Sequence, residues 1–221
     1  MIRPSRSVKP KKHRGQHFLT DKNMLKKIVS AADIQPTDTI VEIGAGTGNL
    51  TELLAKRAGR VVAIEIDNDL IPILTERLCH DDNVEIVHDD ARTFDPANYE
   101  LRTVPYLVVA NIPYNITSLL IRRLLEADPS PLKMILLVQK EVALRICASP
   151  PEMSILSVAV QYYASARVLF SVPRTCFSPR PKVDSAIVSF RVKMGSGTDS
   201  PRETEPDPIF TALFFRVVHA G

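Results

Sequence analysis

The sequence lacks long apolar runs. None of its hydrophobic stretches reaches the length of a transmembrane helix. The basic N-terminus also contains no apolar stretch of the kind that secretory signals carry. These absences argue against a membrane or secreted protein, so we expect a cytoplasmic one. With 45% hydrophobic and 24% charged residues, the chain has the composition of a folded globular protein rather than a disordered one.

Cysteine is also scarce, and there is no internal repeat. The chain has 3 cysteines, at Cys79, Cys147 and Cys176. Because they are widely spaced, they form neither a disulfide framework nor a CxxC metal site. We interpret them as buried or incidental thiols and expect no metal centre.

Acidic residues are missing ahead of Asp21. The net charge of the chain is only +3, but basic residues gather in this first segment: Arg3, Arg6, Lys9, Lys11, Lys12 and Arg14. We predict that residues 1–16 form a basic arm that follows the phosphate backbone of a nucleic acid. Composition alone leaves open the alternative of a solvated tail without a partner.

Strand-like and helix-like patterns alternate along most of the chain. At 221 residues, it is long enough for one large domain with a small addition. Apolar, β-branched runs typical of strands occupy residues 39–44, 60–67, 83–87, 106–110 and 134–139. A helical pattern that Thr20 or Asp21 can cap precedes the first run. Further helical patterns separate most of the others, one of them over about residues 68–78. This order predicts an α/β fold with a mostly parallel sheet and helices on both faces.

The last third of the chain is less regular. Two further runs, at residues 166–172 and 185–192, could complete the sheet with an antiparallel edge. Residues 195–208 are rich in Gly, Ser, Pro and charge, as linkers are. We therefore predict a domain over residues 17–194, a linker over 195–208 and the start of a helical segment over 209–221.

The residues that follow each strand are the first candidates for a site, because ligands bind at the carboxyl ends of parallel strands. Gly44, Gly46 and Gly48 follow the first strand and let the backbone approach a ligand at a helix N-terminus. Glu65 ends the second strand, where a carboxylate can accept both hydroxyls of a ribose. The pair predicts an adenosine-containing cofactor. The G-x-G-x-G spacing departs from the spacing expected for NAD, which disfavours a nicotinamide dehydrogenase.

Two further strand ends carry polar residues. Asp90 follows the third strand and can accept a hydrogen bond from an adenine amino group, although a turn or helix-cap role remains open. At the next strand end, the Asn111 side-chain oxygen and the Ile112 carbonyl can accept from an exocyclic amine, which favours a nucleophilic nitrogen. Pro113 would keep this turn rigid, and Tyr114 would stack on a flipped base. A plain proline turn is the alternative, but its place after a parallel strand favours the catalytic interpretation.

The sequence resembles the KsgA-type ribosomal RNA adenine N6-dimethyltransferases, which act on the small ribosomal subunit. The resemblance covers about residues 11 to 192 and rests on the segments "KKHRGQHFLTD", "VEIGAGTGNLT", "AIEID", "NIPYNITS", "LVQKEVALRI" and "FSPRPKVDSAIV". It implies a Rossmann-like class I methyltransferase fold with a seven-stranded sheet. It also implies that S-adenosylmethionine is the donor and that two adjacent adenosines near the 3′ end of 16S rRNA each receive two methyl groups.

The resemblance also assigns residues and partners. It places the cofactor against Gln16, His17, Leu19, Gly44, Gly46, Glu65, Ile66, Asp90, Ala91 and Asn111. It places the adenine between Tyr114 and Phe177, in a catalytic set with Asn111, Ile112 and Pro113. The expected partner is small-subunit rRNA in a pre-30S particle, bound by a monomer. Residues 209–221 would be the remnant of a C-terminal helical RNA-binding domain.

The sequence departs from the usual family pattern at three places. His17 stands where Asn is frequent, Asp89 stands where Gly is frequent, and "PPEMSILSV" replaces a more usual Tyr-Gly-Arg-Leu-Ser lead-in. Two alternatives remain open at this stage. One is a nucleic-acid-binding factor for ribosome assembly or transcription that keeps the fold. The other is an enzyme that methylates adenine in large-subunit (23S) rRNA, although "VQKEVALRI" favours the small-subunit branch.

Overall fold

The computed structural model describes residue 11 and residues 15–193. The predicted linker (195–208) and the predicted helical remnant (209–221) lie outside these described residues, as does most of the predicted basic arm. Within the described part of the chain, no helix is long and apolar enough to cross a membrane.

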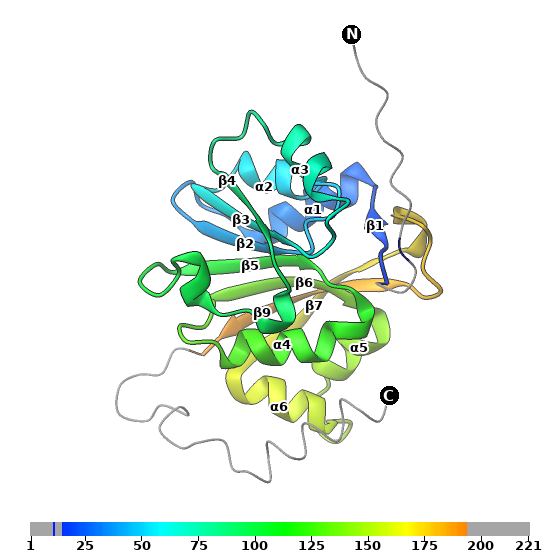
Figure 1. The fold of residues 1–221 in the computed structure, drawn as a ribbon. Coiled ribbons are helices and arrows are strands. Elements are labelled where there is room, and N and C mark those ends of the chain that lie inside the picture. The colour runs from blue at the N-terminus through cyan, green and yellow to red at the C-terminus, as the bar shows by residue number, and fades with distance from the viewer. Residues whose placement is uncertain (1–10, 12–14, 194–221) are drawn as a thin grey trace.

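The centre of the fold is a seven-stranded sheet with strand order β4-β3-β2-β5-β6-β9-β7 (Figure 1). Its strands are β2 (Thr39–Ile43), β3 (Arg60–Glu65), β4 (Val84–His88), β5 (Tyr106–Asn111), β6 (Lys133–Gln139), β7 (Ala164–Val172) and β9 (Ser185–Val192). The pairings from β4 through β6 are all parallel. Strand β9 is antiparallel to both β6 and β7. The predicted mostly parallel sheet with an antiparallel edge is therefore confirmed.

Helices cover both faces of the sheet. They are α1 (Lys22–Ala32), α2 (Thr51–Ala55), α3 (Ile71–Arg77), α4 (Thr117–Glu126), α5 (Lys140–Ile146) and α6 (Ile155–Tyr163). Successive side chains of a strand point to opposite faces. Accordingly, Met134 and Leu136 of β6 pack in the cluster with α4, α5 and α6, whereas Ile135 and Leu137 pack in the cluster with α1. Figure 1 shows α4, α5 and α6 on one side of the sheet and α1, α2 and α3 on the other.

Local hydrogen bonds made by Asp21 and Asp67 set the first residues of helices α1 and α3. Asp21 caps α1, because its carboxylate accepts the backbone N–H of Met24 at 2.8 Å, as the sequence predicts. The helix predicted over 68–78 begins only at Ile71. Asp67 holds the preceding residues in a turn, because its backbone carbonyl accepts the Leu70 N–H and its side chain accepts the Asp69 N–H.

A second, two-stranded sheet was not predicted. It joins β1 (Phe18–Leu19) to β8 (Phe177–Ser178) in antiparallel register, with Leu19 opposite Phe177. Strands this short show no periodicity in the sequence. This ribbon fastens the N-terminal segment to the loop between β7 and β9, at the edge of the sheet where the candidate site lies.

Candidate functional site

A cavity of about 370 Å³ lies at the carboxyl ends of the parallel strands. Residues at or just beyond the ends of β2, β3, β4 and β5 all contribute to its wall, together with the segment that precedes β1. In the strand order, β3 and β4 lie on one side of β2, and β5 and β6 lie on the other. The side on which the chain adds its next strand therefore changes after β4, although all these strands are parallel. Such a switch point is where open α/β sheets bind ligands.

The glycine turn after β2 forms one wall of this cavity. Gly44 and Gly46 have φ angles of 75° and 61°, in the left-handed region that favours glycine. A Cβ on Gly46 would lie 3.2 Å from the Phe18 ring, so the turn has little room for a side chain. Because glycine has no side chain, the backbone of this turn is open toward a ligand.

Glu65 fixes this turn from the neighbouring strand. Its Oε2 accepts the N–H of Gly46 at 2.8 Å, and its Oε1 accepts the N–H of Asp67 at 2.9 Å. The side chain is buried, and burial raises the pKa of its carboxyl group while these two N–H groups act in the opposite direction. The carboxylate is thus held in one orientation at the wall of the cavity.

Two adjacent carboxylates, Asp89 and Asp90, follow β4 and line the same cavity. Asp89 accepts the hydroxyl of the buried Tyr99 at 2.7 Å. Asp90 instead accepts hydrogen bonds from the guanidinium of Arg92, which lies at the cavity wall as well. The Arg92 guanidinium holds the pKa of the Asp90 carboxyl below its usual value, despite some burial.

The corner after β5 is tied to the N-terminal segment. The side-chain amide of Asn111 donates a hydrogen bond of 3.0 Å to the backbone carbonyl of His17. Because the NH₂ group is used in this way, Oδ1 is the atom of that amide that can accept from a ligand. Pro113 and Tyr114 follow at the cavity wall, and the Tyr114 hydroxyl lies 2.7 Å from Oγ of Ser185 on β9.

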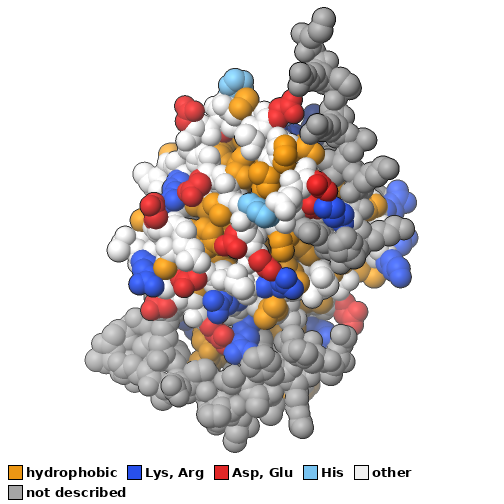
Figure 2. All heavy atoms as spheres, in the orientation of Figure 1, with side chains coloured by type: hydrophobic (Ala, Val, Ile, Leu, Met, Phe, Trp, Pro, Cys, Tyr) orange, Lys and Arg blue, Asp and Glu red, His pale blue; other side chains and the backbone are white. Residues whose placement is uncertain are grey.

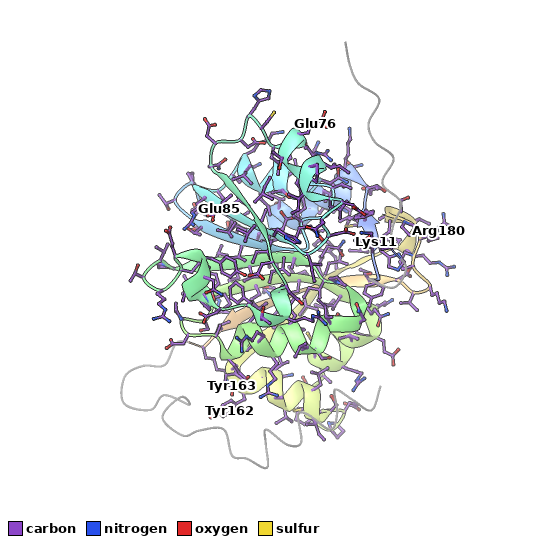
Figure 3. All side chains as sticks on the ribbon, in the orientation of Figure 1. Lys11, Glu76, Glu85, Tyr162, Tyr163 and Arg180 are labelled. Atoms are coloured by element: carbon purple, nitrogen blue, oxygen red, sulfur yellow. The ribbon has the colours of Figure 1, made fainter. Side chains whose placement is uncertain are left out.

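Hydrogen bonds and ion pairs also join the N-terminal segment to the loop after β3. Lys11 Nζ donates to Asp67 Oδ1 at 2.5 Å and lies 2.7 Å from Asp69 Oδ2. Gln16 Nε2 donates to the second oxygen of Asp67 at 2.8 Å. Figure 3 shows Lys11 on the same side of the molecule as Arg180, which belongs to the loop between β8 and β9. The described residues of the predicted arm are therefore packed on the domain.

Most residues proposed from the sequence come together around the cavity. Its lining includes Gln16, His17, Gly44, Gly46, Glu65, Ile66, Asp90, Ala91, Asn111, Ile112, Pro113 and Tyr114. Leu19 and Phe177 are not part of that lining. Both are buried in the apolar cluster around α1, and Leu19 borders a separate cavity of about 30 Å³. The Phe177 ring is thus buried in this cluster, and its place beside the adenine stays a prediction.

The sequence did not indicate several contacts at or near the site. Arg92 lines the cavity only two positions after Asp90, but an exposed arginine after a turn carries no distinctive signal. Lys11 and Asp67 are separated by 56 residues, so no local pattern connects them. Phe18 was part of a recognised segment, and the structure adds that it lines the cavity beside Gly46.

Comparison with known proteins agrees with this geometry. Residues 8–205 match the family described as "Ribosomal RNA adenine dimethylase". A protein from Dehalococcoides mccartyi named "Ribosomal RNA small subunit methyltransferase A" is 41% identical over 215 residues, which cover 97% of this chain and 71% of that protein. A protein of the same name from Streptococcus pneumoniae is 47% identical over 184 residues, covering 80% of this chain and 63% of that protein.

Two solved structures are also similar. A dimethyladenosine transferase from Plasmodium falciparum has a TM-score of 0.75 and 33% identity, over 89% of this chain and 69% of that one. The 23S rRNA methyltransferase ErmE has a TM-score of 0.76 and 30% identity, over 90% of this chain and 80% of that one.

Proposed function

This chain belongs to the ribosomal RNA adenine dimethylase family, and we propose that it transfers methyl groups from S-adenosylmethionine to N6 of adenines in small-subunit rRNA. The observation that carries the proposal is the Asn111 corner. Its amide is fixed on the His17 carbonyl, so Oδ1 is left as the acceptor, and Tyr114 lies beside it in the same cavity as the glycine turn and Glu65.

The cavity fits the proposed cofactor. Gly44 and Gly46 have positive φ angles and present backbone where a Cβ would narrow the space. Glu65 is oriented by two backbone N–H groups and presents carboxylate oxygen for ribose hydroxyls. Asp90 lies just after the next strand, where it would accept a hydrogen bond from an adenine amino group. When bound, S-adenosylmethionine supplies a methyl group on a sulfonium, which is already a strong electrophile.

The residues around Asn111 would prepare the acceptor nitrogen. The lone pair of adenine N6 is delocalised into the ring, so the amine is a poor nucleophile. Asn111 Oδ1 and the Ile112 carbonyl would accept hydrogen bonds from the two N–H groups of the amine. These hydrogen bonds would favour a pyramidal nitrogen. Tyr114 would stack on the flipped base and hold N6 in place. The N6 proton can leave after methyl transfer, so no charged base is required before the attack.

We further propose that the substrate is two adjacent adenosines near the 3′ end of 16S rRNA, each dimethylated in a pre-30S particle by a monomer in the cytoplasm. Support comes from the relatives that carry the small-subunit name. Exposed basic residues also lie near the His17 side of the cavity, at Arg174, Arg180 and Lys182, in the loop whose Pro179 carbonyl contacts His17. Such residues suit contacts with RNA phosphates. On the face drawn in Figure 2, basic and acidic side chains of the described residues are interspersed.

A second candidate is methylation of large-subunit rRNA. It is favoured by the likeness to the ErmE structure. The TM-score of that structure is 0.76, and the TM-score of the dimethyladenosine transferase is 0.75. The higher identity to the small-subunit relatives, 41% and 47% against 30%, favours the first candidate.

The test is methyl incorporation from labelled S-adenosylmethionine into unmethylated small subunits, followed by mapping of the modified nucleotides. We expect Asn111→Ala to abolish incorporation while leaving the affinity for RNA nearly unchanged. Asn98→Ala, an exposed position outside the cavity, is the matched control and should be fully active. Modification of large-subunit rRNA instead would support the second candidate. RNA binding without any methyl transfer would support a binding factor and overturn the proposal.

A further inference from the structure

Arg92 covers the carboxylate proposed to recognise adenine. Its Nε lies 3.0 and 2.8 Å from the two carboxylate oxygens of Asp90, and its Nη2 lies 2.6 Å from Oδ2. The backbone N–H of Arg92 also donates to Oδ1 at 3.0 Å. A guanidinium fork of this kind satisfies both oxygens of a carboxylate at once. The lone pairs that an adenine amino group needs are thus already engaged within the chain.

Asp89 cannot take over this task as readily. Its Oδ2 accepts the hydroxyl of Tyr99, which is only 2% exposed, and its Oδ1 accepts the backbone N–H of Asp90. Displacing Tyr99 would leave a buried hydroxyl without a partner, which is costly. The Arg92 side chain is 54% exposed, so its guanidinium can return to water at little cost. Of the two carboxylates, Asp90 is therefore the one whose present hydrogen bonds a ligand can replace.

We propose that Arg92 competes with the adenine of the cofactor for Asp90, and so sets how tightly and how selectively the chain binds its cofactor. The inference rests on the proposed function, since it takes an adenosine cofactor as the ligand. Both residues line the cavity, and the guanidinium holds the carboxylate oxygens that the adenine amino group would use. Cofactor binding exchanges the Arg92 bonds for a bond from the adenine amino group.

The competition has two consequences that a merely structural arginine would not have. First, removal of the guanidinium should strengthen binding of an adenine ligand, and only because the ligand carries an amino group. Second, the effect should shrink as salt is added, since an exposed ion pair weakens with ionic strength. The size of the effect follows from the strength of exposed ion pairs, which corresponds to about two- to five-fold in affinity.

The experiment measures binding of S-adenosylhomocysteine and of its hypoxanthine analogue, in which an exocyclic carbonyl oxygen on C6 replaces the amino group, by calorimetry on the full chain. We expect Arg92→Gln to bind S-adenosylhomocysteine about two- to five-fold more tightly than the unmodified protein at low salt, with the two converging at high salt. Binding of the hypoxanthine analogue should not improve. Arg102→Gln removes the same charge from an exposed position outside this cavity and should leave both affinities unchanged.

The outcomes separate this inference from the proposed function. Asp90→Asn should weaken S-adenosylhomocysteine binding and abolish the gain from Arg92→Gln. If the unmodified protein and Asp90→Asn behave as expected but Arg92→Gln binds equally or more weakly, only the inference about Arg92 is overturned. An equal gain for the hypoxanthine analogue would also overturn it. If the unmodified protein binds neither ligand, the proposed function itself fails. Thermal unfolding of each variant verifies that it is folded during the measurement.

Discussion

The imidazole of His17 stacks on the ring of Tyr114, with 5.6 Å between the ring centroids and 29° between the planes. His17 is itself held by the Pro179 carbonyl, which accepts from Nδ1 at 2.8 Å. One face of Tyr114 is therefore covered by a fixed ring. A base that stacks on Tyr114 must use the opposite face or displace the imidazole.

The ring of Tyr114, and not its hydroxyl, should carry its contribution to activity. Base stacking on an aromatic side chain is worth about 1–3 kcal/mol, so Tyr114→Ala should lower kcat/KM by about 5- to 150-fold. Tyr114→Phe keeps the ring and loses only the contact with Ser185, so its kcat/KM should stay close to that of the unmodified protein. Ser185→Ala removes the same contact from the other side and is the matched control. Equal losses in the Phe and Ala variants would refute the stacking role.

Glu65→Gln should weaken cofactor binding strongly. The substitution removes the charge that would accept ribose hydroxyls, and it turns an NH₂ group toward one of the two backbone N–H donors. Hydrogen bonds to charged groups are worth about 1.5–3 kcal/mol, so the Kd for S-adenosylhomocysteine should rise by about 10- to 150-fold.

Glu85→Gln is the control for this change. Glu85 is an exposed residue of β4, paired with Arg60 at 2.7 Å and visible at the edge of the sheet in Figure 3. Calorimetry should show an unchanged Kd for it. An unchanged Kd for Glu65→Gln would mean that Glu65 only supports the turn.

Gly46→Ala should reduce both stability and cofactor affinity. The left-handed conformation costs a residue with a Cβ about 1–2 kcal/mol, and the new methyl group would lie 3.2 Å from Phe18 at the cavity wall. Gly59→Ala provides a control, because its Cβ would approach the Pro36 carbonyl at 2.7 Å, away from the cavity. Denaturant unfolding should show a loss in both variants, whereas only Gly46→Ala should bind S-adenosylhomocysteine more weakly. Weakened binding in both would indicate a general loss of structure.

Glu42→Gln should stabilise the protein increasingly as the pH rises. Burial raises the pKa of Glu42 to about 8 from 4.5, and the nearby Glu65 acts in the same direction. Its Oε2 has no hydrogen-bond partner among the described residues. Between those two pH values the folded protein keeps a proton that the unfolded chain has lost, so stability falls as the pH rises toward 8.

The glutamine variant has no such proton to lose. Relative to the unmodified protein, its free energy of unfolding should therefore rise between pH 5 and pH 8, by an amount on the order of 3 kcal/mol. Denaturant unfolding at several pH values measures this difference. A difference that does not change with pH would show that Glu42 is ionised in the folded protein.

Local patterns were sufficient to predict the strands of the main sheet and four of the positions that line the cavity. The strand ends at Gly44, Glu65, Asp90 and Asn111 follow apolar runs whose length and β-branching indicate buried strands. Because parallel strands bring their carboxyl ends to one edge, these four positions had to meet there. The start of α3 was predicted too early, since the turn that delays it depends on hydrogen bonds made by Asp67.

The sequence by itself determined the sheet, its antiparallel edge and the turns that only glycine and proline form readily, because these follow from side-chain periodicity and from the allowed backbone angles. Only the tertiary structure decided that Lys11 clasps Asp67, that Phe177 is buried opposite Leu19, and that Arg92 covers Asp90. These contacts depend on how distant segments pack together and on how an exposed side chain folds back. The spacing of residues along the chain does not encode either of these features.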